Sequence, residues 1–497
     1  MHRRNFIKLG AATGGLFSIA RALTAAAAPL LTRARHLPAQ VALSPETPLP
    51  PGKRPPFGWK TALVDATPLP LAWPGLPAAA TPTRLRLTVG LDIRDEKLIE
   101  AFLPQSGRVV GTFDIRYGCI FQPYEIALAA SDAAALRREG LALRLTKGGP
   151  ARIFSTGEGL PAEFQPHLLV PGTADPLTEY YSRMNTLACV QAFSWQEGCV
   201  LDGLLDLSAR PAHAGLRDAA HRHLAQFIRA GKLVYENHVS DVSDGRIYGI
   251  EGTLPFAALA QLDPASPLLE MPLKFWAARH DAEGAVIDGG HTSSEGAYTV
   301  GYPMAVLGRA RGDETLQKLA LTQLRTRHAR LFDGQTFWRT RDATDGKKGN
   351  RNWARGIAWQ LLGAARTLRE LKHRADLAEP IASFQQLAGW TLAFQRPDGL
   401  WSCFVDEPAT PADTAGSAGI GAALALGAQQ GWLDTSARAA ATRCFAGLST
   451  HLTPDGFLGG VAQANKGGER LQRGDYRVVY QMGMGLMAQL IAALETK

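Results

Sequence analysis

Cysteine is scarce in this sequence: the chain has five, an odd number, and no Cys-x-x-Cys spacing. This usage argues against a disulfide scaffold and against a zinc site. We expect most of the five to be small buried residues, with a Cys189–Cys199 bridge as the open alternative. The histidines are scattered and no nucleotide-binding glycine loop is present, so we predict neither a metal site nor a cofactor.

Long apolar runs are also lacking. No stretch beyond the extreme N-terminus reaches the ~18 uninterrupted apolar residues of a membrane-spanning helix, so we expect no stable membrane anchor. The chain carries 53 Lys and Arg against 45 Asp and Glu, a formal net charge of +8, but no Lys/Arg block. We therefore expect no nucleic-acid partner, and attribute the excess charge to a compositional bias or to attraction of an acidic small substrate. The sequence does not determine the oligomeric state.

The N-terminus carries a targeting pattern. Residues 2–8 read HRRNFIK, and a mildly apolar stretch rich in Gly and Ala follows, ending in ALTAAAAP. This order resembles a twin-arginine export signal with an Ala-x-Ala cleavage site. We assign 1–28 to a signal peptide and predict that the protein is periplasmic or secreted.

Three further segments differ in pattern. Residues 29–80 are rich in Pro and Ala and are predicted to form a linker and extended arm. In 81–176, short runs of period-two alternation broken by Gly and Pro predict a β-rich accessory domain, with a helix near SDAAALRREG. From 177 to 497, apolar residues recur at three- and four-residue spacing, which is typical of helices.

The predicted fold class is mostly α. The candidate helices lie near 177–192, 195–208, 213–231, 249–262, 266–280, 295–310, 313–331, 352–372, 376–396, 414–430, 434–450 and 477–495. Such helices in six hairpins would close into an (α/α)6 toroid, with its long loops at one rim. A helical solenoid would instead show a constant repeat and a consensus, and neither is visible. Recurring Asp-Gly pairs mark turns between the hairpins.

Two carboxylates stand at predicted helix starts. Glu251 opens an apolar helix, and Glu295 lies in HTSSEGAYTVGYPMAV among small, aromatic and aliphatic residues. Each could serve only to favour the helix dipole in a first turn. Near Glu295, however, Tyr298 and several glycines replace solvating charges and would let a ligand approach the backbone. A carboxyl group in such surroundings can have a raised pKa and hold a proton at neutral pH, as a general acid must.

The stretch NRNWARGIAWQLLGA forms a third cluster, with Trp353 and Trp359 flanking Arg355 at a predicted helix start. Tryptophan stacks on sugar faces, and arginine forks onto carboxylates. Burial at a helix–helix contact is the alternative for the two tryptophans. Burial of this kind accounts less well for the charged Arg355.

WARGIAW, followed by QRPDGLWSCFVDEPATPADTAGSAG and DGFLGGV, resembles the unsaturated uronyl hydrolases of glycoside hydrolase families 88 and 105. The resemblance covers roughly 180–495 and implies the toroid. It also implies an anionic substrate, an oligosaccharide that ends in a 4,5-unsaturated uronic acid. In this chemistry an acidic side chain protonates the enol-ether double bond, water adds at the other carbon, and the hemiketal opens to release the sugar.

The resemblance extends to individual residues. Glu295 falls where the family has its catalytic Asp and would be the general acid/base, and Glu251 falls near the first family Asp, one hairpin earlier, and would orient substrate or water. Both being Glu is a departure. The family's histidine before the Trp-Ala-Arg-Gly motif is missing, and Arg339 or His291 would take its place near the substrate. We assign the other substrate-binding roles to Trp353, Arg355, Trp359, Trp401, Tyr298 and Asp413.

Alternative functions remain open at this point. An inverting glycosidase on the same toroid would use both glutamates as acid and base, about 6.5–9.5 Å apart. A polysaccharide lyase would rely on Tyr with His or Arg. A non-catalytic glycan-binding protein is favoured by the two Glu departures and the missing histidine.

Overall fold

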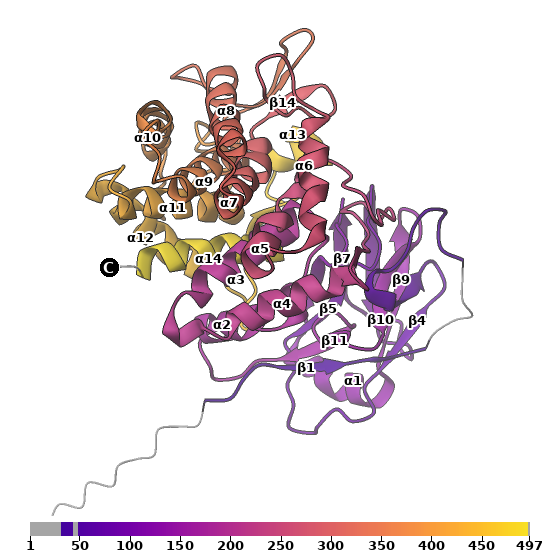
Figure 1. The fold of residues 1–497 in the computed structure, drawn as a ribbon. Coiled ribbons are helices and arrows are strands. Elements are labelled where there is room, and N and C mark those ends of the chain that lie inside the picture. Colours follow the sequence, from indigo (N-terminus) through magenta and orange to yellow (C-terminus); the bar gives the residue numbers. More distant parts are fainter. Residues whose placement is uncertain (1–30, 43–47, 496–497) are drawn as a thin grey trace, which may run out of the picture.

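The computed structural model describes residues 31–42 and 48–495, so the predicted signal peptide lies outside the described residues. A β-rich part, formed by the first third of the chain, lies beside a larger helical part (Figure 1). Across the described ranges, no helix has the length and apolar character needed to cross a membrane.

Two antiparallel sheets dominate the β-rich part. Their strand orders are β1-β11-β5-β8 and β2-β4-β9-β6-β7, and β3 pairs separately with β10. The strands are β1 Arg35–Pro38, β2 Gln40–Val41, β3 Lys60–Val64, β4 Leu69–Ala72, β5 Arg84–Thr88, β6 Glu96–Phe102, β7 Val109–Arg116, β8 Pro123–Ala127, β9 Leu141–Lys147, β10 Ala151–Thr156 and β11 His167–Val170. Helix α1 (Ala133–Glu139) lies before β9, where the sequence predicted a helix.

The segment 29–80, predicted to be a linker and arm, contributes β1, β2 and β4 to these two sheets and β3 to the pair with β10. In β4, Leu69 and Leu71 are buried and alternate with exposed side chains. The strands are short and include Pro38 and Pro70, which lack the N–H that a central strand needs. Proline content therefore concealed an alternation of only a few residues, and the linker prediction is corrected over these strands.

The helical part begins at Pro176. Its helices are α2 Pro176–Met184, α3 Trp195–Ser208, α4 Leu216–Phe227, α5 Pro255–Leu262, α6 Glu270–Ala277, α7 Tyr302–Arg311, α8 Glu314–Leu331, α9 Ala354–Glu370, α10 Ala378–Leu392, α11 Thr414–Gln429, α12 Thr435–Ser449, α13 Gly468–Arg473 and α14 Gln481–Glu495. Each predicted helix has its counterpart here, and the short α13 is an addition. The predicted mostly α class with a β-rich N-terminal region is confirmed.

Helices α3, α5, α7, α9, α11 and α14 form a closed inner ring. Each packs against the next in chain order, and α14 packs against both α11 and α3. On the outside, α4 packs against α3 and α5, α8 against α7 and α9, α10 against α9, and α12 against α11 and α14. Since the chain alternates between an outer and an inner helix, the inner helices share one direction. This arrangement confirms the (α/α)6 toroid.

Small residues allow the inner ring to close. Helix α11 is buried continuously from Thr414 to Gly427, so it has no solvent-facing stripe. Where α14 meets α3, a Cβ built on Gly485 would lie 2.3 Å from the carbonyl oxygen of Cys199. Any side chain there would push the two backbones apart. The glycine content of the inner helices thus follows from their packing.

Short strands and turns complete the rim loops. The strands are β12 Ile228–Arg229, β13 Lys232–Leu233, β14 His291–Ser293, β15 Trp338–Asp342, β16 Lys348–Arg351, β17 Val461–Ala462 and β18 Arg477–Val478. The glycines of the four Asp-Gly pairs, at 245, 334, 399 and 456, have φ values of 66° to 91°. These left-handed conformations confirm the pairs as turns.

Buried polar contacts fix the β-rich part to the toroid. Arg86 of β5 donates from Nη1 to Oδ2 of Asp455 at 2.6 Å and from Nη2 to Oδ1 at 3.0 Å, and both side chains are fully buried. Nearby, Gln481 at the start of α14 donates to the carbonyl of Phe121 at 3.0 Å. The two parts also share one continuous hydrophobic core.

All five cysteines are buried and unbridged. The Cys189–Cys199 disulfide considered from the sequence does not form, and the thiol of Cys189 instead contacts Met484 of α14 at 3.8 Å. The expectation of small buried cysteines is confirmed.

Candidate active site

A cavity of about 180 Å³ opens where the N-terminal ends of the inner helices meet. It is lined by Trp195, His238, Glu251, Glu295, Arg339, Trp353, Arg355, Trp359, Ala464, Asn465 and Lys466. Six of the predicted site residues therefore come together, namely both carboxylates, two tryptophans and two arginines. They meet because parallel inner helices place their first turns at the same rim.

Glu295 is positioned by a strand pair. It follows β14 and precedes the π-helical turn η7 (Ala297–Gly301), and β14 pairs with β15 in a register that sets Ser293 opposite Thr340. This register brings Arg339 of β15 beside Glu295, with its Nε 2.5 Å from Oε1. The other carboxylate oxygen, Oε2, is buried and has no hydrogen-bond partner among the described residues. One oxygen of Glu295 is thus held by an arginine, and the other is free for a ligand.

Gly296, next to Glu295, has a structural role that differs from the predicted one. The space a side chain would take at Gly296 is filled by the guanidinium group of Arg327. Arg327 is fully buried and donates to the carbonyls of Ser293, at 3.0 Å, and Val286, at 2.6 Å. This glycine therefore admits a buried arginine that supports the loop, and does not bring a ligand to the backbone.

Glu251 is in a different electrostatic state from Glu295. It lies in the 3-10 turn η5 (Ile250–Thr253) ahead of α5, and its side chain is 28% exposed toward the cavity. Burial and the nearby negative charge of Glu295 raise the pKa of Glu251 to about 7, and Arg339 only partly offsets them. The Tyr248 hydroxyl lies 3.4 Å from its Oε2, and His238 Nδ1 lies 3.8 Å away. Near neutral pH the Glu251 carboxyl therefore holds a proton in a substantial fraction of molecules.

Aromatic side chains form one wall of the cavity. Trp353 and Trp359 are each only 4% exposed, whereas Trp195, the first residue of α3, is partly exposed. The rings of Trp195 and Trp359 meet edge to face with centroids 5.5 Å apart. Trp195 therefore offers the larger accessible face for a sugar, and Trp359 holds it in place.

The guanidinium group of Arg355 binds other parts of the protein and is not available to a ligand. It is 1% exposed and donates to the carbonyls of Ala462 at 2.7 Å and Gln463 at 2.6 Å, while its Nε lies 3.4 Å from Oδ2 of Asp413. These contacts clamp the loop that presents Ala464 and Lys466 to the cavity. The predicted fork onto a uronate is corrected to a positioning role, because the guanidinium nitrogens already face carbonyls.

Four predicted substrate-binding residues do not line the cavity. Tyr298 is buried beneath Trp359, and its hydroxyl donates to Asp202 at 2.5 Å. Trp401 is fully buried and donates from Nε1 to the carbonyl of Thr391 at 2.9 Å.

The other two also have local roles. Asp413 caps α11 and accepts from the N–H of Ala462 at 3.0 Å. His291 is half exposed on β14 and lies 3.2 Å from Asp342. Sequence spacing could not separate these residues from the cavity lining because they flank the same motifs.

Sequence reasoning missed Trp195, His238, Tyr248 and Lys466. Trp195 had a usable signal, since it begins an inner helix just as Glu251, Glu295 and Trp353 stand at the starts of theirs. His238 and Lys466 lie in rim loops far apart in the chain. Only folding brings them to the carboxylates.

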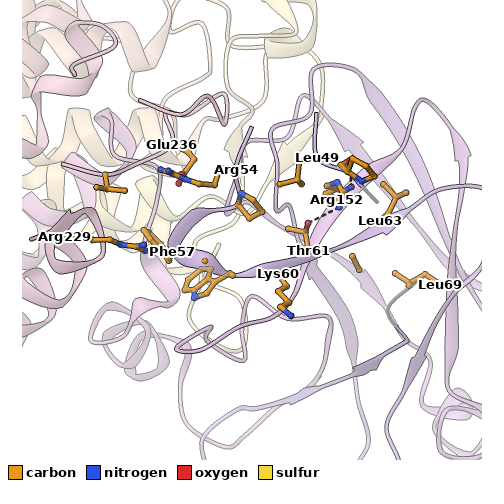
Figure 2. Close-up of a pocket in the computed structure, with 16 residues that line it drawn as sticks. Leu49, Arg54, Phe57, Lys60, Thr61, Leu63, Leu69, Arg152, Arg229 and Glu236 are labelled. Carbon is orange, nitrogen blue, oxygen red and sulfur yellow. Dashed lines mark hydrogen bonds and ion pairs between the residues drawn. The ribbon is translucent and has the colours of Figure 1, made fainter. Parts of the chain in front are cut away.

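A larger cavity of about 760 Å³ lies between residues 48–69 of the β-rich part and residues 229–236 of the helical part (Figure 2). Its polar lining includes Arg54, Lys60, Arg229 and Glu236, and Arg54 is paired with Glu236 there. None of the predicted site residues lines it. The predicted site residues therefore gather in the smaller cavity and not in the larger one.

The fold and this cavity define a carbohydrate-active enzyme on an (α/α)6 toroid. Residues 295–495, from Glu295 to the end of α14, match the model of Glycosyl Hydrolase Family 88. The resemblance inferred from the sequence motifs is thus confirmed over this range, and the helical part is similar to glycoside hydrolases of the unsaturated glucuronyl hydrolase type. No curated protein matches the chain in sequence.

Solved structures share the fold at low sequence identity. A glycoside hydrolase of family 105 from C. acetobutylicum has a TM-score of 0.56 and 17% identity, covering 65% of this chain and 99% of that one. An unsaturated glucuronyl hydrolase specific for heparin has a TM-score of 0.50 and 14% identity, with coverages of 64% and 95%. A polysaccharide lyase has a TM-score of 0.50 and 19% identity, also with coverages of 64% and 95%. The shared architecture alone does not distinguish hydrolysis from elimination.

Proposed function

We propose that this protein hydrolyses oligosaccharides that end in a 4,5-unsaturated uronic acid. The observation that supports the proposal is the pairing, in one cavity, of a carboxyl that holds a proton near neutral pH, Glu251, with a carboxylate that forms an ion pair with an arginine, Glu295. An enol ether needs a proton donor and a group that activates water, and the cavity offers both. Trp195 supplies a face for the sugar ring.

The proposed division of roles reverses the one expected from the sequence. Glu251 donates its proton to C4 of the double bond, which leaves positive charge on C5 and the ring oxygen. Glu295, paired with Arg339, accepts a proton from the water whose oxygen bonds to C5. The C5 hemiketal then opens by breaking its bond to the ring oxygen, and the hemiacetal left at C1 collapses to release the sugar.

Kinetics on a lyase-generated unsaturated disaccharide test this function. The wild-type enzyme removes the double bond, and its ultraviolet absorbance falls. Glu251→Gln and Glu295→Gln each lower kcat by about 10²–10⁴-fold, the usual contribution of one acid–base group. Trp401→Phe, at a buried position outside the cavity, is the matched control and retains activity. Full activity in both glutamine variants would rule out the mechanism.

The direction of the absorbance change distinguishes the alternatives. A polysaccharide lyase creates the double bond, so the absorbance of a polymer substrate rises. An inverting glycosidase cleaves saturated glycosides with no change in absorbance. Glycan binding that persists without turnover in both glutamine variants and in the wild type would indicate a non-catalytic protein.

We also propose export through the twin-arginine route, based on HRRNFIK and the Ala-rich stretch of residues 1–28. Replacing both arginines, as in Arg3→Lys with Arg4→Lys, should leave the protein in the cytoplasm of a producing bacterium. Cell fractionation with and without the substitutions tests this. Periplasmic protein in the double variant would contradict it.

A further inference from the structure

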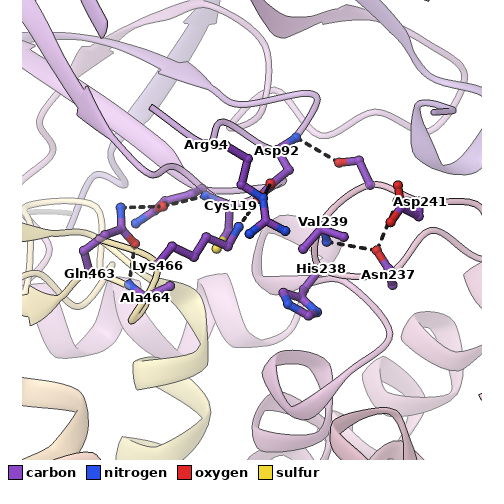
Figure 3. Close-up of polar contacts among 12 residues, drawn as sticks. Asp92, Arg94, Cys119, Asn237, His238, Val239, Asp241, Gln463, Ala464 and Lys466 are labelled. Carbon is purple, nitrogen blue, oxygen red and sulfur yellow. Dashed lines mark hydrogen bonds and ion pairs between the residues drawn. The ribbon is translucent and has the colours of Figure 1, made fainter. Parts of the chain in front are cut away.

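The β-rich part reaches the active-site cavity through the loop 89–95 between β5 and β6. The backbone N–H of Asp92 donates to Oγ of Ser240 at 2.8 Å, and Ser240 lies two residues after the cavity residue His238. The Asp92 side chain is only 2% exposed and pairs with both Lys466 and Arg94. Figure 3 shows Arg94 extending toward His238, with Lys466 ending beside Asp92.

Asp92, Arg94 and Lys466 together give this side of the cavity an excess of positive charge. The single carboxylate of Asp92 faces two cations, Lys466, which lines the cavity, and Arg94, whose side chain is 55% exposed and whose Nε lies 2.5 Å from Oδ2. His238 adds no charge, because burial and the charges of Lys466 and Arg94 lower its pKa to about 3.

The other cations at the cavity are matched one to one. Arg339 pairs with Glu295, and Arg355 lies 3.4 Å from Asp413. The N-terminal ends of the inner helices, which carry partial positive charge, open at the same rim. The uncompensated charge is therefore localised where the loop 89–95 of the β-rich part meets the rim loop that carries Lys466.

We propose that Arg94 and Lys466 form an anion-binding subsite at the mouth of the cavity, for a carboxylate or sulfate group on the sugar next to the unsaturated uronic acid. This inference rests on the proposed function and specifies its substrate. Asp92 positions both cations, and the exposure of Arg94 lets a second sugar reach it from solvent. The β-rich part, which lies outside the family match at 295–495, thereby takes part in substrate selection.

The test compares unsaturated disaccharides whose second sugar is neutral, carboxylated or sulfated. Arg94→Ala is expected to reduce the preference for a charged second sugar, measured as a ratio of kcat/KM values, by about tenfold, the loss of one charge-assisted contact. Lys466→Met reduces the same ratio. The wild-type preference weakens with added salt, because the subsite is partly exposed. Loss confined to the sulfated or to the carboxylated substrate identifies which group is bound.

Arg108→Ala is the matched control. Arg108 also belongs to the β-rich part, is 53% exposed, and lies 2.5 Å from Asp132, whose side chain is 5% exposed. Its substitution should leave the ratio unchanged. Equal losses on neutral and charged substrates in Arg94→Ala, or the same behaviour in both arginine variants, would overturn the subsite.

Calorimetry separates this inference from the proposed function. If the wild-type enzyme turns over none of these substrates, the proposed function fails. The dissociation constants of the same disaccharides still test the subsite, because Arg94→Ala must weaken binding of the charged ones selectively. Binding that ignores the charge of the second sugar, or no binding at all, would refute it.

Discussion

Oε1 of Glu295 accepts a hydrogen bond from Nε of Arg339 at 2.5 Å, and the negative charge of Glu295 contributes to the raised pKa of Glu251. One ion pair therefore bears on both carboxylates in the cavity. Arg339 holds Oε1 of Glu295, and the negative charge of Glu295 favours the protonated form of Glu251. The two carboxyl groups have different partners, as an acid–base pair requires.

The pH dependence of Glu251 follows from this pairing. In the proposed mechanism Glu251 acts in its protonated form, so kcat/KM should fall as pH rises through about 7. Replacing Glu295 by Gln removes the negative charge that raises this pKa, so the pKa of Glu251 should decrease. Arg339→Gln removes a positive charge that lowers it, so the pKa should increase. Carbon-13 NMR titration of labelled glutamate carboxyls measures both shifts without relying on residual activity. Shifts in the same direction for the two variants would contradict the scheme.

Trp195 is predicted to be the sugar platform. Trp195→Ala should raise KM about tenfold, because a stacked aromatic face contributes of order 1 kcal/mol or more. Trp195→Phe keeps a smaller face and should recover part of the loss. Steady-state kinetics on one disaccharide checks the series. Trp401→Phe is again the control, because removing the whole buried indole in Trp401→Ala would leave an internal void. An unchanged KM in Trp195→Ala would place the substrate elsewhere.

The buried pair Arg86–Asp455 should be a major stabilising contact between the β-rich part and the toroid. Asp455→Asn removes the buried counter-charge of Arg86 and leaves only the partly exposed Glu125 as its ion-pair partner, which costs up to about 3–5 kcal/mol. Thermal and denaturant unfolding measure this loss. Replacing both residues with apolar side chains, Arg86→Met with Asp455→Leu, should recover much of it. A stability equal to wild type in the single variant would show that the contact contributes nothing.

The same pair predicts a pH effect on stability. Arg86 and His36 hold the pKa of Asp455 well below its usual range, although burial opposes them. For a carboxyl with a lowered folded pKa, the stabilisation is present above its unfolded pKa of about 3.9 and is lost as pH falls through the folded value. The difference between wild type and Asp455→Asn should therefore be constant near neutrality and shrink only in strongly acidic solution. Unfolding curves across that range check the sign.

Ring closure depends on glycine at the contact of α14 with α3. Gly485→Ala places a Cβ against the carbonyl of Cys199 and should destabilise the protein by about 1–3 kcal/mol. Gly389→Ala is the matched control, since Gly389 is exposed on the outer helix α10 and a Cβ there meets nothing within 4 Å. That substitution should be neutral or stabilising, because alanine favours a helix over glycine. Similar unfolding midpoints for the two variants would contradict the packing argument.

The toroid was predictable because each of its helices is specified by residues close together in the sequence. Apolar residues at three- and four-residue spacing specify each helix, and alternating helix hairpins have few ways to bury every apolar face. The starts of inner helices were also visible in the sequence, which is why Glu251, Glu295 and Trp353 were found. The strands of 29–80 were not, because a few residues interrupted by proline do not show a period.

The sequence by itself determined the helices, their closure into a toroid and the two carboxylates at the rim. Tertiary structure alone decided the partners of those carboxylates. The pairing of β14 with β15 brought Arg339 to Glu295, and the docking of loop 89–95 brought Arg94 close to His238 and Asp92 to Lys466. Such contacts join residues tens to hundreds of positions apart. Their charge states depend on distance and burial, which no local pattern records.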